Sequence, residues 1–158
     1  MLEERKNMTI FVDADACPVI LREELQLIAA DISHIHVYFV ASYQHQLNHL
    51  RENVFHVKGD DYREATDLYI VNHVKAGDVV VTQDIGLASL LLLKKAHVLS
   101  HTGYLFRNET IEGKLFFRHL HAKQRRAGQK TKGPKKYTKF NVQRFKRTLN
   151  KILEKEGL

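Results

Sequence analysis

The chain has 158 residues and a hydrophobic fraction of 44%, which suits one domain with a substantial core and excludes disorder over most of its length. Apolar runs such as residues 90–93 are far too short to cross a bilayer, and residues 1–7 lack the apolar core of a signal peptide. The single cysteine, Cys17, excludes an internal disulfide and a multi-cysteine zinc site. We therefore expect a cytoplasmic protein.

The formal net charge of +7 is unevenly distributed along the chain. Residues 1–112 contain ten Lys and Arg against sixteen Asp and Glu, whereas residues 113–153 contain fourteen Lys and Arg and no acidic residue. A basic segment of this kind attracts polyanions, and nucleic acid is the partner we expect. The alternative is a solvated basic face that has no partner.

Short apolar runs alternate with helical patterns over the first hundred residues. Runs rich in Val, Ile, Phe and Tyr predict strands at residues 9–13, 36–41, 54–57, 79–82 and 97–100. Helices are expected between them at residues 18–30, within 42–52, at 62–76 before Gly77, and at 85–95. This alternation predicts an α/β protein, a three-layer α/β/α sandwich around a central, mostly parallel five-stranded sheet.

After residue 100 the pattern becomes helical and basic. Thr110 is expected to cap a helix over residues 111–126, and a last helix is predicted at 141–156. The Gly-, Lys- and Pro-rich stretch 127–138 has no apolar period, so we expect an exposed, mobile loop there. The expected organisation is an N-terminal extension (1–7), one domain (8–153) and a short tail (154–158).

Three carboxylates follow predicted strands. Asp13 and Asp15 end the first strand, and their side chains share one face if the strand continues through both. Asp84 ends the fourth strand. Ligands of open α/β sheets bind beyond the carboxyl ends of strands, where the strand order reverses. A strand order of 3-2-1-4-5, which right-handed crossovers favour, would bring these three acids together.

Asp67 lies on the helical stripe that contains Ile70, Val71 and Val74, so the pattern turns it toward the sheet. A buried carboxylate is unfavourable without a compensating partner, and clustered carboxylates raise one another's pKa. A divalent cation relieves both penalties, and Mg²⁺ and Mn²⁺ prefer oxygen ligands. The sequence therefore predicts an Mg²⁺ or Mn²⁺ site formed by Asp13, Asp15, Asp67 and Asp84.

Some acidic residues also fit structural roles. Asp84 stands directly before a helix and Asp15 stands near the start of another, where Asp is a favoured N-cap. Asp61 and Glu64 have the spacing of a capping box, which favours a structural role for Glu64 over metal binding.

A family resemblance is carried by four segments of the chain: DADACP, EATDLYI, VVVTQDIGLA and RRAGQKTKGPKKYTKFNVQRF. They resemble the bacterial YaiI/YqxD family, small and largely uncharacterised proteins regarded as relatives of PIN-domain nucleases. The resemblance, which spans residues 8–153, implies a PIN-like α/β/α sandwich, bound Mg²⁺ or Mn²⁺, and hydrolysis of RNA phosphodiester bonds. It implies an acidic set of Asp13, Asp15, Asp67 and Asp84, with Glu64 as a further candidate.

Two positions depart from the family pattern. Gly86 stands where many relatives have Pro, which should alter only the loop. Asn141 stands where Asp is expected, so this position cannot supply a charged ligand, although Asn can still cap a helix.

In a nuclease, the acids would hold one or two ions on the scissile phosphate and water would be the nucleophile. Thr82 and Gln83 lie close enough to Asp84 in sequence to orient water or phosphate. Basic side chains would follow the backbone of single-stranded RNA, namely Lys123, Arg125, Arg126, Lys130, Lys132, Lys135 and Lys136. Three interleaved aromatic residues could stack on bases, although the two Phe also fit a helix core: Tyr137, Phe140 and Phe145.

Two other functions remain open. A phosphatase of the haloacid dehalogenase type would use Asp13 as nucleophile and Asp15 as acid/base. Cys17 at the fifth motif position and the wide separation of Asp78 from Asp84 argue against it. The second alternative is a non-catalytic RNA-binding protein of the same fold.

Overall fold

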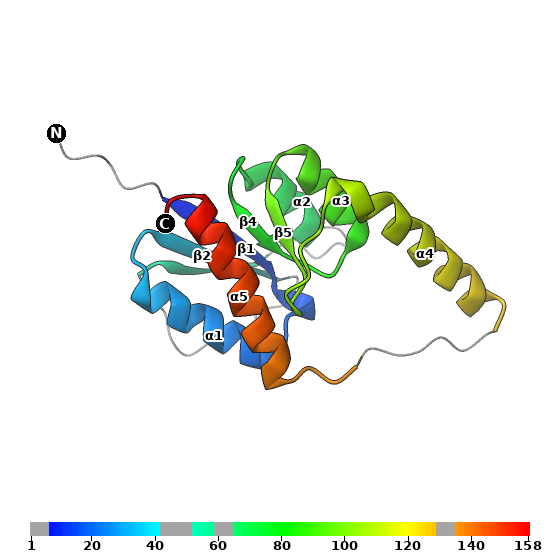
Figure 1. Cartoon of the computed structure of the whole chain (residues 1–158), viewed down its shortest axis with the longest axis horizontal. Coiled ribbons are helices and arrows are strands. Elements are labelled where there is room, and N and C mark those ends of the chain that lie inside the picture. The colour runs from blue at the N-terminus through cyan, green and yellow to red at the C-terminus, as the bar shows by residue number, and fades with distance from the viewer. Residues whose placement is uncertain (1–6, 42–51, 59–64, 129–134) are drawn as a thin grey trace.

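The computed structural model describes residues 7–41, 52–58, 65–128 and 135–158. Five strands form one parallel sheet in the order β3-β2-β1-β4-β5 (Figure 1). The strands are β1 (Met8–Asp13), β2 (Ile35–Ala41), β3 (Val54–Lys58), β4 (Val79–Val81) and β5 (His97–Leu99). The predicted fold class and the predicted strand order are both confirmed.

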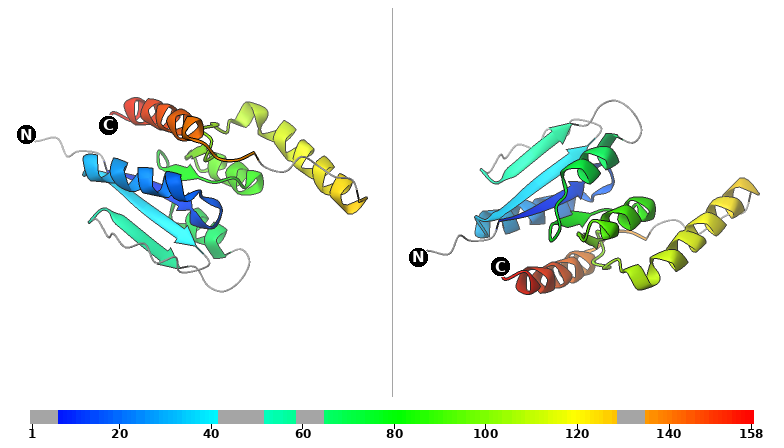
Figure 2. Two further views of the ribbon diagram at one scale, coloured as in Figure 1. Left: turned by 90° about the horizontal axis from the view of Figure 1, so that it is seen from below. Right: turned by 90° about the horizontal axis from the view of Figure 1, so that it is seen from above.

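Helices cover both faces of the sheet, as the alternation of strand and helix predicts. They are α1 (Val19–Asp31), α2 (Ala65–His73), α3 (Ile85–Leu93), α4 (Asn108–Arg126) and α5 (Lys139–Lys155). Helices α1 and α5 lie on one face, and α2 and α3 lie on the other (Figures 1 and 2). Within the described ranges, no helix is both long enough and apolar enough to span a membrane.

The central strand β1 contributes to two separate cores because its side chains alternate between the faces. Ile10 and Val12 are buried on the face that α1 and α5 cover, whereas Phe11 is buried against α2 and α3. Phe145 of α5 is fully buried in the first core, so its predicted core role is confirmed. Phe140 of the same helix is 80% exposed, so a core role is wrong for this residue.

The C-terminal third first leaves the sheet and then returns to it. Leu105 bridges to Leu99 of β5, and the chain then enters α4, which projects away from the domain body (Figure 2). Helix α5 comes back across the first face and ends near the start of β1, close to the beginning of the described chain (Figure 1). Two α4 aromatics, Phe116 and Phe117, are 63% and 58% exposed.

The two largest differences from the predicted helix boundaries are at the start of α4 and the end of α2. Helix α4 begins at Asn108, after Arg107, so Thr110 is not its cap. The Thr110 hydroxyl lies instead 3.2 Å from the Tyr104 hydroxyl. Helix α2 ends at His73 and not at residue 76, because a turn follows it in which Asp78 Oδ2 accepts a hydrogen bond from the backbone N–H of Lys75.

Other predictions in this region are confirmed or fall on undescribed residues. Asn141 is part of a capping box at the start of α5, where its Oδ1 accepts a hydrogen bond from the backbone N–H of Thr138 at 2.9 Å. The short helix predicted within residues 42–52 falls almost wholly outside the described residues. In the predicted basic loop, residues 127–128 and 135–138 have neither helix nor strand, and residues 129–134 are not described.

Candidate metal site and its surroundings

The two strands at the reversal of strand order, β1 and β4, end beside each other and carry the first part of the site. Asp13 is the last residue of β1, and Thr82 follows the last residue of β4. The buried Thr82 hydroxyl donates a 3.2 Å hydrogen bond to Asp13 Oδ2 and accepts a 3.1 Å bond from the backbone N–H of Asp84. This hydroxyl therefore holds two of the predicted acids in a fixed relation.

Asp13 is half-buried, and its surroundings disfavour a negative charge. The pKa of Asp13 is raised from an ordinary value of 3.8 to about 6, and burial is the largest cause. The nearby carboxylates of Asp67, Asp15 and Asp84 contribute to this rise, while the hydrogen bond from Thr82 opposes it. The four predicted acids thus interact electrostatically at one sheet edge, although they come from three separate segments of the chain.

Asp15 does not extend β1, so the prediction that Asp13 and Asp15 share a strand face is wrong. The strand ends at Asp13, and Asp15 lies in a 3-10 turn, η1 (Ala14–Ala16), with its side chain exposed. The turn closes when the backbone N–H of Cys17 donates to the carbonyl of Ala14. Asp15 reaches the site from this turn at the surface.

Asp84 has a structural role as well as its place in the cluster. Its Oδ1 accepts a 3.0 Å hydrogen bond from the backbone N–H of Leu87 and so caps α3, as its position before a helix predicts. The Arg118 guanidinium, from α4, lies 3.5 Å from the same oxygen. Among the described residues, the other oxygen, Oδ2, accepts no hydrogen bond, and it is the atom of Asp84 best placed to meet a ligand.

Asp67 comes from α2 and is half-buried, in agreement with the predicted helical stripe, in which Ile70 and Val74 are buried. Asp67 and Asp84 line a pocket of about 500 Å³ between α2, α3 and α4. Arg118 lines it from the third side, with apolar side chains of α2 and α3 forming its floor. The charged side chains that line the pocket are therefore two carboxylates, Asp67 and Asp84, and one guanidinium, Arg118.

The fit of this site to a cation depends on how many direct ligands the cation needs. Among the described residues, no three His, Cys, Asp or Glu side chains are arranged to hold one ion together. Mg²⁺ keeps several waters and is usually held by one or two carboxylates together with substrate phosphates. Asp13 and a second acid would supply that smaller set. Glu64, the further candidate, lies outside the described residues.

The residues next in sequence to Asp84 have other partners. The hydroxyl of Thr82 already bridges Asp13 and Asp84, so Thr82 positions the acids. The side chain of Gln83 is exposed, and its Oε1 accepts a hydrogen bond from the backbone N–H of His101. The carbonyl of His101 in turn accepts a 2.7 Å bond from the Tyr137 hydroxyl. Tyr137, at the end of the predicted basic loop, is thus anchored to His101, which lines one small pocket together with Asp13.

The predicted nucleic-acid-binding residues fall into two described groups and one undescribed group. Lys123, Arg125 and Arg126 are exposed on the far end of α4, away from the sheet (Figure 2). Lys135 and Lys136 are exposed just before the anchored Tyr137. Lys130 and Lys132 lie outside the described residues. Sequence reasoning missed Arg118, because its contact with Asp84 joins positions 34 residues apart.

Two further residues have structural roles. Cys17 is buried, and burial raises the pKa of its thiol to about 12, so the thiolate is strongly disfavoured. Asp78 lies at the opposite end of β4, where it accepts hydrogen bonds from the backbone N–H groups of Thr9 and Lys75. Asp78 is therefore remote from Asp13, and the phosphatase alternative lacks this residue as a partner.

A doubly wound parallel sheet with acids beyond the strand ends at the reversal of strand order defines an α/β protein with a candidate site at its topological switch point. The chain belongs to the YaiI/YqxD family: the family model described as "Uncharacterized BCR, YaiI/YqxD family" matches residues 11–155.

Bacterial relatives match nearly the whole chain. It is 52% identical to a UPF0178 protein of Bacillus velezensis over 157 residues, which cover 98% of this chain and 90% of the relative. It is 47% identical to a UPF0178 protein of Halalkalibacterium halodurans over 91% of this chain and 89% of the relative. A UPF0178 protein of Listeria monocytogenes is 42% identical over 92% of this chain and 95% of the relative. No solved structure matches the chain.

Proposed function

We propose that this protein is a divalent-metal-dependent hydrolase of the phosphodiester bonds of single-stranded RNA. The observation that carries the proposal is the position of Asp13, whose carboxyl group is half-buried and is influenced by the carboxylates of Asp67, Asp15 and Asp84. Such an arrangement costs stability unless a cation compensates it. Perturbed acids at a topological switch point are typical of a functional site.

The roles of the residues follow from their contacts. Asp13 and one neighbouring acid would hold Mg²⁺ or Mn²⁺, which would supply Lewis-acid stabilisation of the charged phosphate. The Thr82 hydroxyl hydrogen-bonds to both Asp13 and Asp84 and so fixes their relative position. Arg118, at the rim of the acidic pocket, would attract the phosphate group, and the basic segment would hold the rest of the strand.

One observation favours a second function, a non-catalytic RNA-binding protein. Arg118 lies 3.5 Å from Asp84 Oδ1, and the same oxygen caps α3, so part of this carboxylate is satisfied without a cation. In that case the basic residues would bind RNA, and the acidic residues would only stabilise the folded structure.

A cleavage assay with an Mn²⁺ titration separates these functions. We expect the protein to cleave a single-stranded oligoribonucleotide when Mn²⁺ is added and to be inactive with chelator. Asp13→Asn should abolish cleavage and retain RNA binding, because it removes one charge and leaves the basic residues in place. Asp31→Asn is the matched control, since Asp31 is exposed at the end of α1.

Cleavage that is equal in the parent protein and in Asp13→Asn would indicate a contaminating nuclease and contradict the proposal. RNA binding without metal-dependent cleavage by the parent would favour the non-catalytic alternative.

A further inference from the structure

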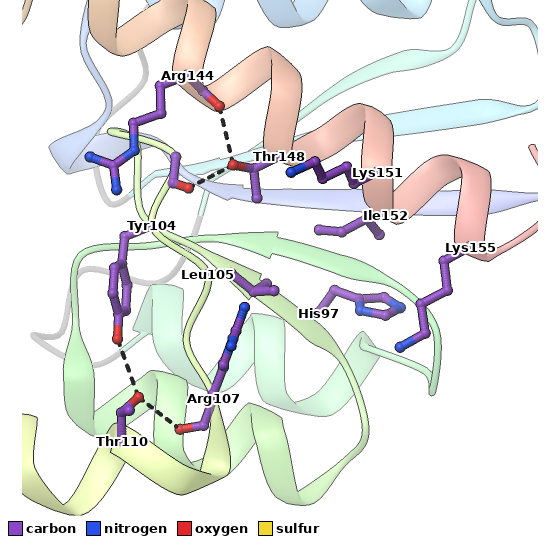
Figure 3. Close-up of a pocket in the computed structure, with 11 residues that line it drawn as sticks. His97, Tyr104, Leu105, Arg107, Thr110, Arg144, Thr148, Lys151, Ile152 and Lys155 are labelled. Atoms are coloured by element: carbon purple, nitrogen blue, oxygen red, sulfur yellow. Dashed lines mark hydrogen bonds between the residues drawn. The ribbon is translucent and has the colours of Figure 1, made fainter.

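A second cavity, which shares no lining residue with the acidic pocket, lies between α5 and the segment that joins β5 to α4 (Figure 3). Its volume is about 480 Å³, within the range of ligand-binding pockets. None of the described residues that line this cleft is acidic, and four of them are permanently basic: Arg107, Arg144, Lys151 and Lys155. We call it the α5 cleft.

The basic groups of the α5 cleft are available to a ligand. All four side chains are exposed. Among the described residues, none of them has a hydrogen-bond or ion-pair partner, in contrast to Lys146 on the same helix, which lies 2.8 Å from Glu24. At the far end of the cleft, the Glu156 carboxylate lies 2.7 Å from His97 Nε2. Four cations without an ion-pair partner among the described residues surround one cavity, and such a group of charges favours an anionic ligand.

Close packing fixes the walls of the cleft. Gly103 has a φ of +88°, and a Cβ atom there would lie 2.7 Å from the backbone nitrogen of Phe145, so only glycine allows this approach to α5. The Thr148 hydroxyl donates a 2.8 Å hydrogen bond to the Gly103 carbonyl across the same contact (Figure 3). The ring of Tyr104, which also lines the cleft, lies 3.8 Å from Lys114 Nζ.

The spacing of the cations indicates the shape of the ligand. Arg144, Lys151 and Lys155 lie on one side of α5, and the rise of a helix separates the first from the last by about 16 Å. A single phosphate cannot meet all three, whereas a chain of phosphates can. Separate basic side chains, each contacting one phosphate, are typical of proteins that follow a single strand.

We propose that the α5 cleft binds consecutive phosphate groups of a single-stranded RNA segment. The inference extends the proposed function, because it adds a second contact surface for the same substrate beyond the basic residues of α4 and residues 127–138. A nucleoside triphosphate also carries a short chain of phosphates, and the experiment below distinguishes it from RNA as the ligand.

The test compares two charge-matched double variants of α5. Arg144→Gln with Lys151→Gln removes two cations from the cleft, and Lys139→Gln with Arg147→Gln removes two from elsewhere on the helix. Binding of a fluorescent oligouridylate of about 12 nucleotides is measured by anisotropy with chelator present, so that cleavage cannot contribute. ATP serves as the competing probe, and thermal melting verifies that both variants are folded.

We expect the cleft variant to bind the oligonucleotide at least roughly tenfold more weakly at 0.1 M salt. Its salt dependence should also flatten by about 1.4 in log–log slope, since each lost phosphate contact contributes about 0.7. The control pair should change both quantities much less. Equal losses in the two variants, or no loss in the cleft variant, would overturn the proposal. So would ATP binding that depends on Arg144 and Lys151 while oligonucleotide binding does not.

The two proposals fail separately. Unchanged RNA binding by the cleft variant, together with Mn²⁺-dependent cleavage by the parent, refutes the cleft and leaves the hydrolase intact. Weakened RNA binding without cleavage by the parent refutes the hydrolase and leaves the cleft intact.

Discussion

The hydroxyl of Thr82 donates a hydrogen bond to Asp13 across the two strands at which the strand order reverses, and its length is 3.2 Å. The same hydroxyl accepts a bond from the backbone N–H of Asp84, so one buried oxygen serves both acids. Position 82 therefore connects the stability of the sheet edge to the geometry of the candidate site.

Thr82→Val should destabilise the fold by about 1–3 kcal/mol, because the N–H of Asp84 loses its acceptor while the side chain keeps its shape. The pKa of Asp13 should rise further, since the hydrogen bond from Thr82 lowers it. Denaturant unfolding and the pH dependence of RNA cleavage are the measurements. Thr82→Ser, which keeps the hydroxyl, is the control, and equal loss of activity in both variants would contradict a role for the hydrogen bond.

The raised pKa of Asp13 predicts how stability depends on pH without metal. The folded protein keeps this proton up to about pH 6, whereas the unfolded chain loses it near 3.8. The folded state therefore binds more protons in this window, and stability falls as the pH rises from about 4 to about 6 and stays lower above it. The cost at pH 8 is on the order of 2–3 kcal/mol.

Asp13→Asn should remove this cost. We expect the variant to melt at least about 4 °C higher than the parent at pH 8, and the difference to shrink toward pH 4. Thermal unfolding followed by circular dichroism with chelator present is the measurement. A lower melting temperature for Asp13→Asn at pH 8 would show that the carboxylate is already compensated in the folded protein.

Added Mn²⁺ should stabilise the parent protein, because a ligand that binds only the folded state raises its stability by about 2.7 kcal/mol at 100 times its Kd. Asp13→Asn and Asp67→Asn should lose most of the shift in melting temperature, while Asp31→Asn should respond as the parent does. An equal shift in all four proteins would place the ion outside the carboxylate cluster.

Arg118→Gln should increase Mn²⁺ affinity several-fold, because it removes a positive charge that lies 3.5 Å from Asp84 Oδ1. The two side chains are 52% and 35% exposed, and such a pair contributes at most about 1 kcal/mol, so the melting temperature should hardly change. Isothermal titration calorimetry measures the affinity. Arg125→Gln, further along α4, is the charge-matched control, and the same increase there would indicate a general effect of net charge.

The order of the strands and the type of each main element could be predicted from the sequence, because both depend on local patterns. Buried parallel strands need runs of branched and aromatic residues, such as the valines of β4, and the crossovers between them have one preferred hand. Helix boundaries depend on finer balances. Thr is a residue type that favours the N-cap, which is why Thr110 is predicted there. In the structure, Leu105 pairs with Leu99 of β5, and α4 begins three residues later, at Asn108.

The sequence by itself indicated which acids the candidate site contains, because Asp13, Asp15 and Asp84 follow predicted strands and the helical stripe turns Asp67 toward the sheet. Only the tertiary structure decided how they act: Thr82 joins two of them, Arg118 contacts one, and Asp15 lies in a turn. The α5 cleft likewise exists only in the fold. Spacing along the chain fixes the direction of nearby side chains, whereas hydrogen bonds and charge contacts between distant segments depend on how those segments pack.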